Sequence, residues 1–416
     1  MKLPSTCIEL AEELDQEDWV LERDKVDIQV YSRQQASGSE VIGFKTVSYH
    51  AFSLGQGATF LQDVRGAMKH MNPMYAMGEV FGPWPTNEDP NGQLIRTAFQ
   101  IPFPIGAREF VHGVHCLVPD PNTRIITYTP TERPSIPTLP GYIRSTTYLS
   151  GQRLMLLPNG LCRVEHLMTY TLKGRISSFV QDVILKPSHI GAYIKEWRAL
   201  RKALVPTKND VDIKQLTHIT TSMLEESQSW PIQKQPSTGG EVRVGRTPSC
   251  PQDAFRLDLI VNSPLEHVVD VLGDKSLEYL PQWNVEFREG QILETLEATS
   301  KRTSWLIRVV YKTPWFLADR EYVYVFTREW LNDDTALIMY LSVAHPTTEA
   351  KDISRARLYP SVHRCTRLAD GQTHIEHILA TDLGGKLSRW QSSLLKGGLV
   401  SAQCRDMKNQ QRLLGV

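Results

Sequence analysis

Residues 94–111 read LIRTAFQIPFPIGAREFV, and residues 306–323 read LIRVVYKTPWFLADREYV. Both stretches begin with Leu-Ile-Arg, have a proline eight residues later, and end with Arg-Glu, an aromatic residue and Val. They lie 212 residues apart. Self-similarity at a fixed spacing is the sequence signature of a repeated structural unit. The two segments therefore predict that the chain is built twice from one unit.

The similarity extends outward from these segments at a nearly constant spacing. Further pairs lie 211 or 212 residues apart: Trp19 and Trp230, Phe44 and Phe255, Tyr128 and Tyr340, Arg144 and Arg355, Glu165-His166 and Glu376-His377, and Leu172 and Leu383. A unit of roughly 200 residues has the size of a single domain. The sequence predicts one domain over residues 1–205 and a second over residues 210–416.

The composition is that of an ordinary globular protein without a charge bias. Hydrophobic residues make up 41% of the chain and the formal net charge is zero. No basic field attracts nucleic acid, so a nucleic-acid partner is not expected. The six cysteines have no paired spacing, which is typical of a reducing compartment. No apolar run reaches the length of about 18 residues that a spanning helix needs. We expect a cytoplasmic protein.

Within each unit the pattern changes from strands to one long helix. Segments such as VIGFKTVSYH (41–50), CRVEHLMTYTL (162–172) and FRLDLIVN (255–262) favour strands. Turn residues separate such segments at short intervals, which is typical of antiparallel meanders. Residues 176–204 instead carry apolar side chains at spacings of three and four, as in a helix that lies against a sheet. The predicted class is α+β.

Several of these motifs resemble the START (steroidogenic acute regulatory protein-related lipid transfer) family. The family has an early Trp, a strand reading V-Y-S-R, and a segment P-x-P-x-x-x-R-[DE]-[FY]-V. This chain has Trp19, VYSR at 30–33 and PFPIGAREFV at 102–111, with PWFLADREYV at 314–323 as the second copy. The family's L-K-G entry to its last helix is similar to TLKGRISSF at 171–179 and DLGGKLSRW at 382–390.

The resemblance implies two tandem helix-grip (START/Bet v 1-like) domains, each a curved antiparallel β-sheet wrapped on a long C-terminal α-helix. It also implies non-enzymatic binding of one lipid in a hydrophobic tunnel, transfer of that lipid between membranes, transient contact with a membrane surface, and no cofactor. The sterol, ceramide, fatty acid, glycerolipid and carotenoid classes stay open. Phosphatidylcholine-binding members have an Arg and an Asp where this chain has Leu280 and Asn284. Sterol-binding members have a buried Arg where Val114 and Phe326 stand.

Three groups of residues are candidates for ligand contact. The proline-rich yet apolar loops at 101–107 and 313–318 either cover a cavity mouth or touch a membrane, or else fold onto their own core. The gate candidates are Ile101, Phe103, Ile105, Trp315, Phe316 and Leu317. The candidates lining the closing helices are Val180, Val183, Ile184, Leu394 and Leu395. The polar candidates are the duplicated Arg96 and Arg308, Arg144 and Arg355, Glu165 and Glu376, and His166 and His377.

An arginine among these polar candidates either points inward, to the polar end of a lipid or to a carboxylate, or is a salt-bridged residue at a strand end. An unpaired buried charge is too costly to keep.

Other chemistries find little support in the sequence. His112 and His115, like His374 and His377, have a metal-like spacing, but residues three apart in a strand point to opposite faces. No metal site is therefore predicted. No Gly-rich phosphate loop and no G-x-S-x-G motif occurs. Two alternatives to a lipid carrier stay open: a cyclase-like or hydrolase-like enzyme of the related helix-grip superfamily, with Glu165, His166 and Tyr170 converging in the tunnel, and a ligand-sensing scaffold.

Overall fold

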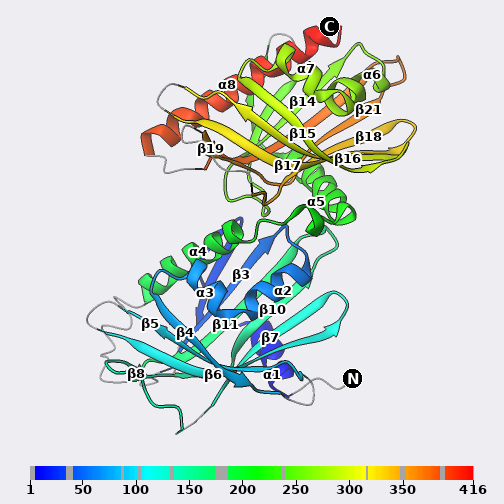
Figure 1. Ribbon diagram of the computed structural model, residues 1–416. Coiled ribbons are helices and arrows are strands. Elements are labelled where there is room, and N and C mark those ends of the chain that lie inside the picture. Colours follow the sequence, from blue (N-terminus) through cyan, green and yellow to red (C-terminus); the bar gives the residue numbers. More distant parts are fainter. Residues whose placement is uncertain are drawn as a thin grey trace. The chain divides into compact units, whose positions relative to one another are not determined.

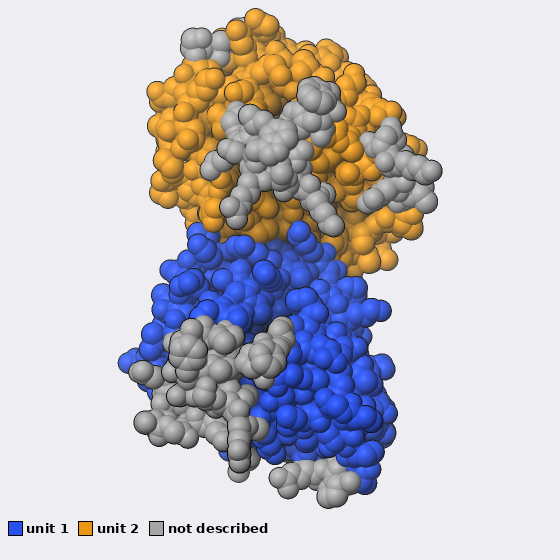
Figure 2. Space-filling model, turned by 90° about the vertical axis from the view of Figure 1, so that its left-hand side faces the viewer, with its two compact units in different colours: residues 1–204 blue, residues 205–416 orange. Residues whose placement is uncertain are grey.

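The computed structural model describes residues 5–33, 41–85, 89–101, 105–131, 135–173, 186–236, 239–314, 317–346, 353–384 and 389–415. The chain divides into two compact units, residues 1–204 and 205–416 (Figure 2). Each unit is an antiparallel sheet with helices on both faces (Figure 1). The expectation of two tandem α+β domains is confirmed.

The first unit contains eleven strands and four helices in its described residues. Its strands are β1 (Val20–Lys25), β2 (Ile28–Arg33), β3 (Val41–His50), β4 (Tyr75–Pro83), β5 (Gln93–Phe99), β6 (Arg108–Asp120), β7 (Thr123–Pro130), β8 (Ile143–Arg144), β9 (Thr146–Thr147), β10 (Ser150–Leu156) and β11 (Cys162–Thr171). Its helices are α1 (Ser5–Asp15), α2 (Leu54–Gln62), α3 (Val64–Met71) and α4 (Lys186–Ala203). The main strand order is β1-β2-β3-β11-β10-β7-β6-β5-β4, with β8 beside β6 and β9 beside β11.

The second unit repeats this plan. Its strands are β12 (Ile232–Lys234), β13 (Glu241–Gly245), β14 (Ala254–Val261), β15 (Phe287–Ala298), β16 (Arg302–Tyr311), β17 (Asp319–Asn332), β18 (Thr335–Ser342), β19 (Ile353–Arg355), β20 (Arg357–Leu358), β21 (Ser361–Arg367) and β22 (Thr373–Asp382). Its helices are α5 (Ile213–Glu226), α6 (Leu265–Val269), η4 (Asp270–Asp274), α7 (Ser276–Trp283) and α8 (Arg389–Leu413), with short 3-10 turns η2 (Lys208–Asp210) and η3 (Ser227–Ser229). The order β12-β13-β14-β22-β21-β18-β17-β16-β15 matches the first sheet strand by strand.

Strand alternation gives each sheet two differently covered faces. In β7, Ile126 packs into the core with helices α2, α3 and α4. Its neighbour Ile125 packs with Leu10 and Leu14 of helix α1. Successive strand side chains point to opposite faces, so the long closing helix and the opening helix lie on opposite faces of the sheet.

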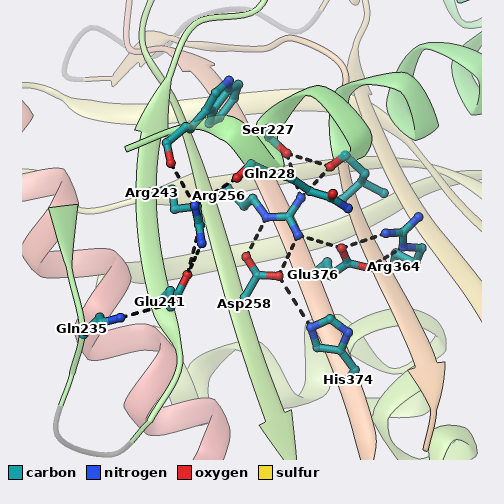
Figure 3. A network of polar contacts seen from close by, with 12 residues as sticks. Ser227, Gln228, Gln235, Glu241, Arg243, Arg256, Asp258, Arg364, His374 and Glu376 are labelled. Atoms are coloured by element: carbon teal, nitrogen blue, oxygen red, sulfur yellow. Dashed lines mark hydrogen bonds and ion pairs between the residues drawn. The ribbon is translucent and has the colours of Figure 1, made fainter. Parts of the chain in front are cut away.

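A buried ion-pair network fixes the opening helix of the second unit to the outer face of its sheet (Figure 3). Arg256 on β14 donates to the carbonyl oxygen of Leu224 and to the hydroxyl of Ser227, at the end of α5. The same guanidinium pairs with Asp258 at 2.6 Å and with Glu376 at 2.7 Å. The network thus connects β14 and β22 to the end of α5.

None of the described helices has both the length and the apolar composition needed to cross a membrane.

Candidate ligand-binding cavities

Each unit has a partly open cavity between the inner face of its sheet and its closing helix. The first cavity has a volume of about 100 Å³, and the second has a volume of about 540 Å³. Ligand pockets usually measure about 300–1,000 Å³. Among the described residues, the second cavity therefore has the size of a ligand site and the first does not.

Equivalent turns of the closing helices line both cavities. His189, Ala192, Tyr193 and Glu196 of α4 line the first. The residues 210 positions later, Leu399, Ala402, Gln403 and Asp406 of α8, line the second. The spacings of three, four and seven place these side chains on one face of a helix.

A series of neighbouring aromatic rings lines the first cavity. Phe99, Phe110, Tyr170, His189 and Tyr193 follow one another with ring centroids 5.9–6.4 Å apart. The second unit has rings only at the first two places, Tyr311 and Tyr322.

At the other three places the second unit has Thr381, Leu399 and Gln403, all of which line its cavity. Smaller or more flexible side chains at these three places leave more space beside α8.

Each cavity has an amide–carboxyl pair made of a buried acid and a half-buried asparagine. Helix α3 is followed by Asn72 and helix α7 by Asn284, each in an extended C-cap conformation. Asn72 Nδ2 donates to Glu196 at 2.6 Å, and Asn284 Nδ2 donates to Asp406 at 3.0 Å. Burial raises the pKa of Glu196 to about 7. Burial likewise raises the pKa of Asp406 to about 7. Both carboxyl groups therefore stay protonated up to nearly neutral pH.

Histidine side chains add a second polar feature. In the second cavity His363 and His377 stand opposite each other on β21 and β22, with ring centroids 3.8 Å apart. Tyr340 Oη lies 2.9 Å from His363 Nδ1. Burial lowers the pKa of His377 to about 3, so the imidazole is neutral. In the first cavity burial lowers the pKa values of His112 and His166 to about 4.

The predicted polar residues divide by strand alternation. His166 and His377 line their cavities. The preceding Glu165 and Glu376 face the other side and pair with arginines, Arg153 with Glu165 at 2.5 Å and Arg256 with Glu376 at 2.7 Å. Tyr170 also lines the first cavity, so two of the three residues expected to converge in an enzyme lie there without Glu165.

The four predicted arginines lie outside both cavity linings. Arg96 and Arg144 both bind Glu109, at 3.3 and 2.5 Å. In the second unit Arg308 and Arg355 both bind Glu321. Each acid belongs to the duplicated Arg-Glu-aromatic-Val segment, and each forms a buried centre for two arginines.

The gate and helix candidates are only partly within the described residues. Ile101 lines the first cavity, and Thr313 and Pro314 at the start of the second loop line the second. Ile105 is buried against Phe110 and Leu172. Leu317 is partly buried.

The remaining candidates are not described. Phe103, Trp315, Phe316, Val180, Val183 and Ile184 lie outside the described residues, as do the side chains of Leu394 and Leu395 in α8.

No group of three or more His, Cys, Asp or Glu side chains in the described part of the chain is placed to hold a metal ion. His112 lines the first cavity, whereas His115 lies 3.8 Å from Asp89.

The sequence prediction missed the amide–carboxyl pairs and the partners of the histidines. One signal was present: Asn72 and Asn284 follow the 212-residue spacing of the repeat. The acids Glu196 and Asp406 follow a spacing of 210.

A cavity between a curved antiparallel sheet and a long closing helix defines a helix-grip ligand-binding protein. The sequence model of the START domain family matches residues 9–206 and 212–413. The chain therefore belongs to the START domain family, which is known for lipid binding and transfer.

Solved structures give more distant similarities. The human StAR-related lipid transfer protein 5 is 19% identical, with a TM-score of 0.42, over 49% of this chain and 95% of that one. Human STARD10 is 15% identical, with a TM-score of 0.41, over 48% and 80%. The di-domain ARO/CYC StfQ from the steffimycin biosynthetic pathway is 10% identical, with a TM-score of 0.26, over 89% and 97%. The comparison with curated proteins gives no match.

Proposed function

We propose that this protein binds a lipid in an internal cavity and transfers it between membranes without catalysing a reaction, and that its second unit holds the ligand. The observation that carries the proposal is the cavity of about 540 Å³ between α8 and the inner face of the second sheet. Apolar side chains such as Leu257, Leu280 and Phe326 contribute to its lining. Burial of apolar ligand surface against them supplies the affinity.

The two units take different parts in this function. We assign START-like domains to residues 1–205 and 210–416, in line with the family matches over 9–206 and 212–413. The ring-filled first domain acts as a packed partner, and the second acts as the carrier. The loop at 313–318 starts at the cavity lining with Thr313 and Pro314, which suits it to act as a gate at a cytoplasmic membrane surface.

A catalytic function of the polar residues in the first cavity is supported less well than lipid binding. His112, His166 and Glu196 are acid–base residues that line the first cavity. The cavity volume of about 100 Å³ is smaller than the roughly 150 Å³ that holds benzene in an engineered protein core. A lipid-sized substrate does not fit in the first cavity as the described residues form it.

The test is native mass spectrometry of the gently purified full chain, followed by extraction and identification of any lipid. Two equivalent positions provide matched variants, since Ala402 lines the second cavity and Ala192 lines the first. Ala402→Trp fills the larger space and is expected to abolish lipid occupancy. Ala192→Trp is expected to leave one lipid bound.

Circular dichroism shows whether both variants are folded. A wild-type chain that carries no lipid, and takes none from mixed liposomes, contradicts the carrier function. Lipid that is lost with Ala192→Trp and retained with Ala402→Trp contradicts the assignment to the second unit.

A further inference from the structure

One oxygen of the Asp406 carboxyl group accepts a hydrogen bond and the other does not. An oxygen without a hydrogen-bond donor is called open below. Asp406 is 6% exposed and lines the second cavity. Its Oδ2 accepts a hydrogen bond from Asn284 Nδ2 at 3.0 Å. Its Oδ1 is buried and has no hydrogen-bond partner among the described residues. Arg405 Nε forms an ion pair with this oxygen at 3.7 Å, which is beyond hydrogen-bond distance, and Arg405 also pairs with Glu286.

The partner amide has the same incomplete bonding. Asn284 Oδ1 is also buried without a hydrogen-bond partner among the described residues. Two acceptor oxygens, one on each side chain, are therefore open within one hydrogen-bonded pair that lines the cavity. A buried polar atom without a partner costs about 1–3 kcal/mol, and a ligand that provides the missing bond regains this.

We propose that Asp406, oriented by Asn284, is the polar recognition residue of the second cavity, and that it selects an uncharged lipid with a free hydroxyl group. The proposal rests on the proposed function and names its ligand class. A hydroxyl group both donates and accepts. It donates to Asn284 Oδ1 or to an ionised Asp406, and it accepts from a protonated Asp406.

Acidic ligands fit the Asn284–Asp406 pair less well than an alcohol does, although the basic residues Lys312, Arg320 and Arg405 line the same cavity. A carboxylate or phosphate offers acceptors alone, so it can bond to a protonated Asp406 but not to Asn284 Oδ1, and an ionised Asp406 repels it. A pure hydrocarbon fits poorly for the opposite reason, because it covers both open oxygens without bonding to either. Both classes are disfavoured relative to an alcohol with the same apolar body.

The size of the cavity limits the apolar body. At roughly 30 Å³ for each water-sized group, a volume of 540 Å³ holds about 18 such groups. A single chain or a compact ring system has this size. A lipid with two long chains exceeds it.

The experiment compares three probes with one hydrocarbon skeleton: 1-hexadecanol, hexadecane and hexadecanoate. Native mass spectrometry in competition gives their relative occupancy on the full wild-type chain and on three variants. We expect the wild type to prefer hexadecanol by about tenfold over each of the others, the effect of one buried hydrogen bond. Asp406→Leu removes this preference, and Asp406→Asn retains most of it because an amide also donates and accepts.

The control is Asp270→Leu, which removes an exposed acid that pairs with Lys275 and does not line the cavity. It is expected to keep the tenfold preference. Equal binding of hexadecanol and hexadecane by the wild type, or preferred binding of hexadecanoate, overturns the proposal while the carrier function stands. Failure of all three probes and of every liposome lipid to bind overturns the carrier function as well.

A measurement on the wild type covers the case in which Asp406→Leu does not fold. With 13C-labelled aspartate, Asp406→Asn assigns the carboxyl resonance of Asp406 by its disappearance. Hexadecanol is expected to shift this resonance and hexadecane to leave it in place. A resonance that responds equally to both probes contradicts a hydrogen bond to the hydroxyl group.

Discussion

Glu109→Gln is expected to destabilise the first unit strongly, because it removes the charge shared by two arginines. Glu109 is fully buried. It accepts from Arg144 at 2.5 Å and from the backbone N–H of Leu139 at 3.1 Å, and it pairs with Arg96 at 3.3 Å. Removing one partner of a buried ion pair costs about 3–5 kcal/mol. The side chain of Arg144 is 25% exposed and can reach water, so the lower end, about 3 kcal/mol, is expected.

Glu79→Gln is the matched control, because Glu79 binds the same Arg96 from the surface. Its side chain is 44% exposed, and its distance to the guanidinium is 3.0 Å. An exposed ion pair contributes about 0–1 kcal/mol. For a unit of about 200 residues, 1 kcal/mol corresponds to roughly 2–4 °C in Tm. The expected losses are about 6–12 °C for Glu109→Gln and at most about 4 °C for Glu79→Gln.

Thermal unfolding followed by circular dichroism gives the change in Tm. Hydrogen exchange of peptides from β5 and β6 assigns it to the first unit. If Glu109→Gln lowers Tm no more than Glu79→Gln does, the buried acid is not a structural centre, and a ligand role for Arg96 and Arg144 becomes open again.

Three further predictions follow from the second cavity. The carboxyl resonance of Asp406 is expected to titrate near pH 7. The folded state then keeps a proton that the unfolded chain loses above about pH 4. The contribution of this group to the free energy of unfolding therefore falls by up to about 1.4 kcal/mol per pH unit between pH 4 and 7. This fall is expected to be absent in Asp406→Asn. For His377 the sign is opposite: its lowered pKa of about 3 gives a contribution present above about pH 6.5 and lost as the pH falls, so His377→Phe is expected to reduce the acid sensitivity of the unfolding midpoint. Thr381→Tyr with Gln403→Tyr introduces two ring side chains of the first unit and is expected to abolish lipid occupancy in native mass spectrometry, whereas occupancy equal to wild type contradicts the assignment of the cavity.

The repeat and the inner strands were predictable from sequence because burial gives them a clear pattern. Strands β3 and β11 lie within segments predicted as strands, and β14 coincides with a third to within one residue. The edge strands β4 and β15 were missed, since most of their side chains are exposed or partly exposed. An edge strand with solvent on one side carries little hydrophobic alternation.

The ligand-facing residues were harder to predict, because sequence shows polarity but not direction. In Glu165-His166 and Glu376-His377, strand alternation requires the two side chains to face opposite sides. Which one faces the cavity depends on the partners of the glutamate, and these include Arg153 and Arg256 from neighbouring strands. The arginines of the Leu-Ile-Arg motif were uncertain for the same reason, since their acid lies 13 residues further along the chain.

The comparison of the two units separates structural polar groups from groups suited to a ligand. Glu109 and Glu321 have the same two-arginine environment in both units, whatever the size of the cavity, as expected of residues that hold the sheet together. The amide–carboxyl pair is also present in both, but its surroundings differ. In the first unit it lies in the ring-filled space of about 100 Å³, and in the second it borders about 540 Å³. The two open oxygens of the second pair carry an energetic cost that packing alone does not offset. A ligand hydroxyl offsets that cost only where the cavity also has room for the rest of the ligand. Of the two cavities, the second has this room.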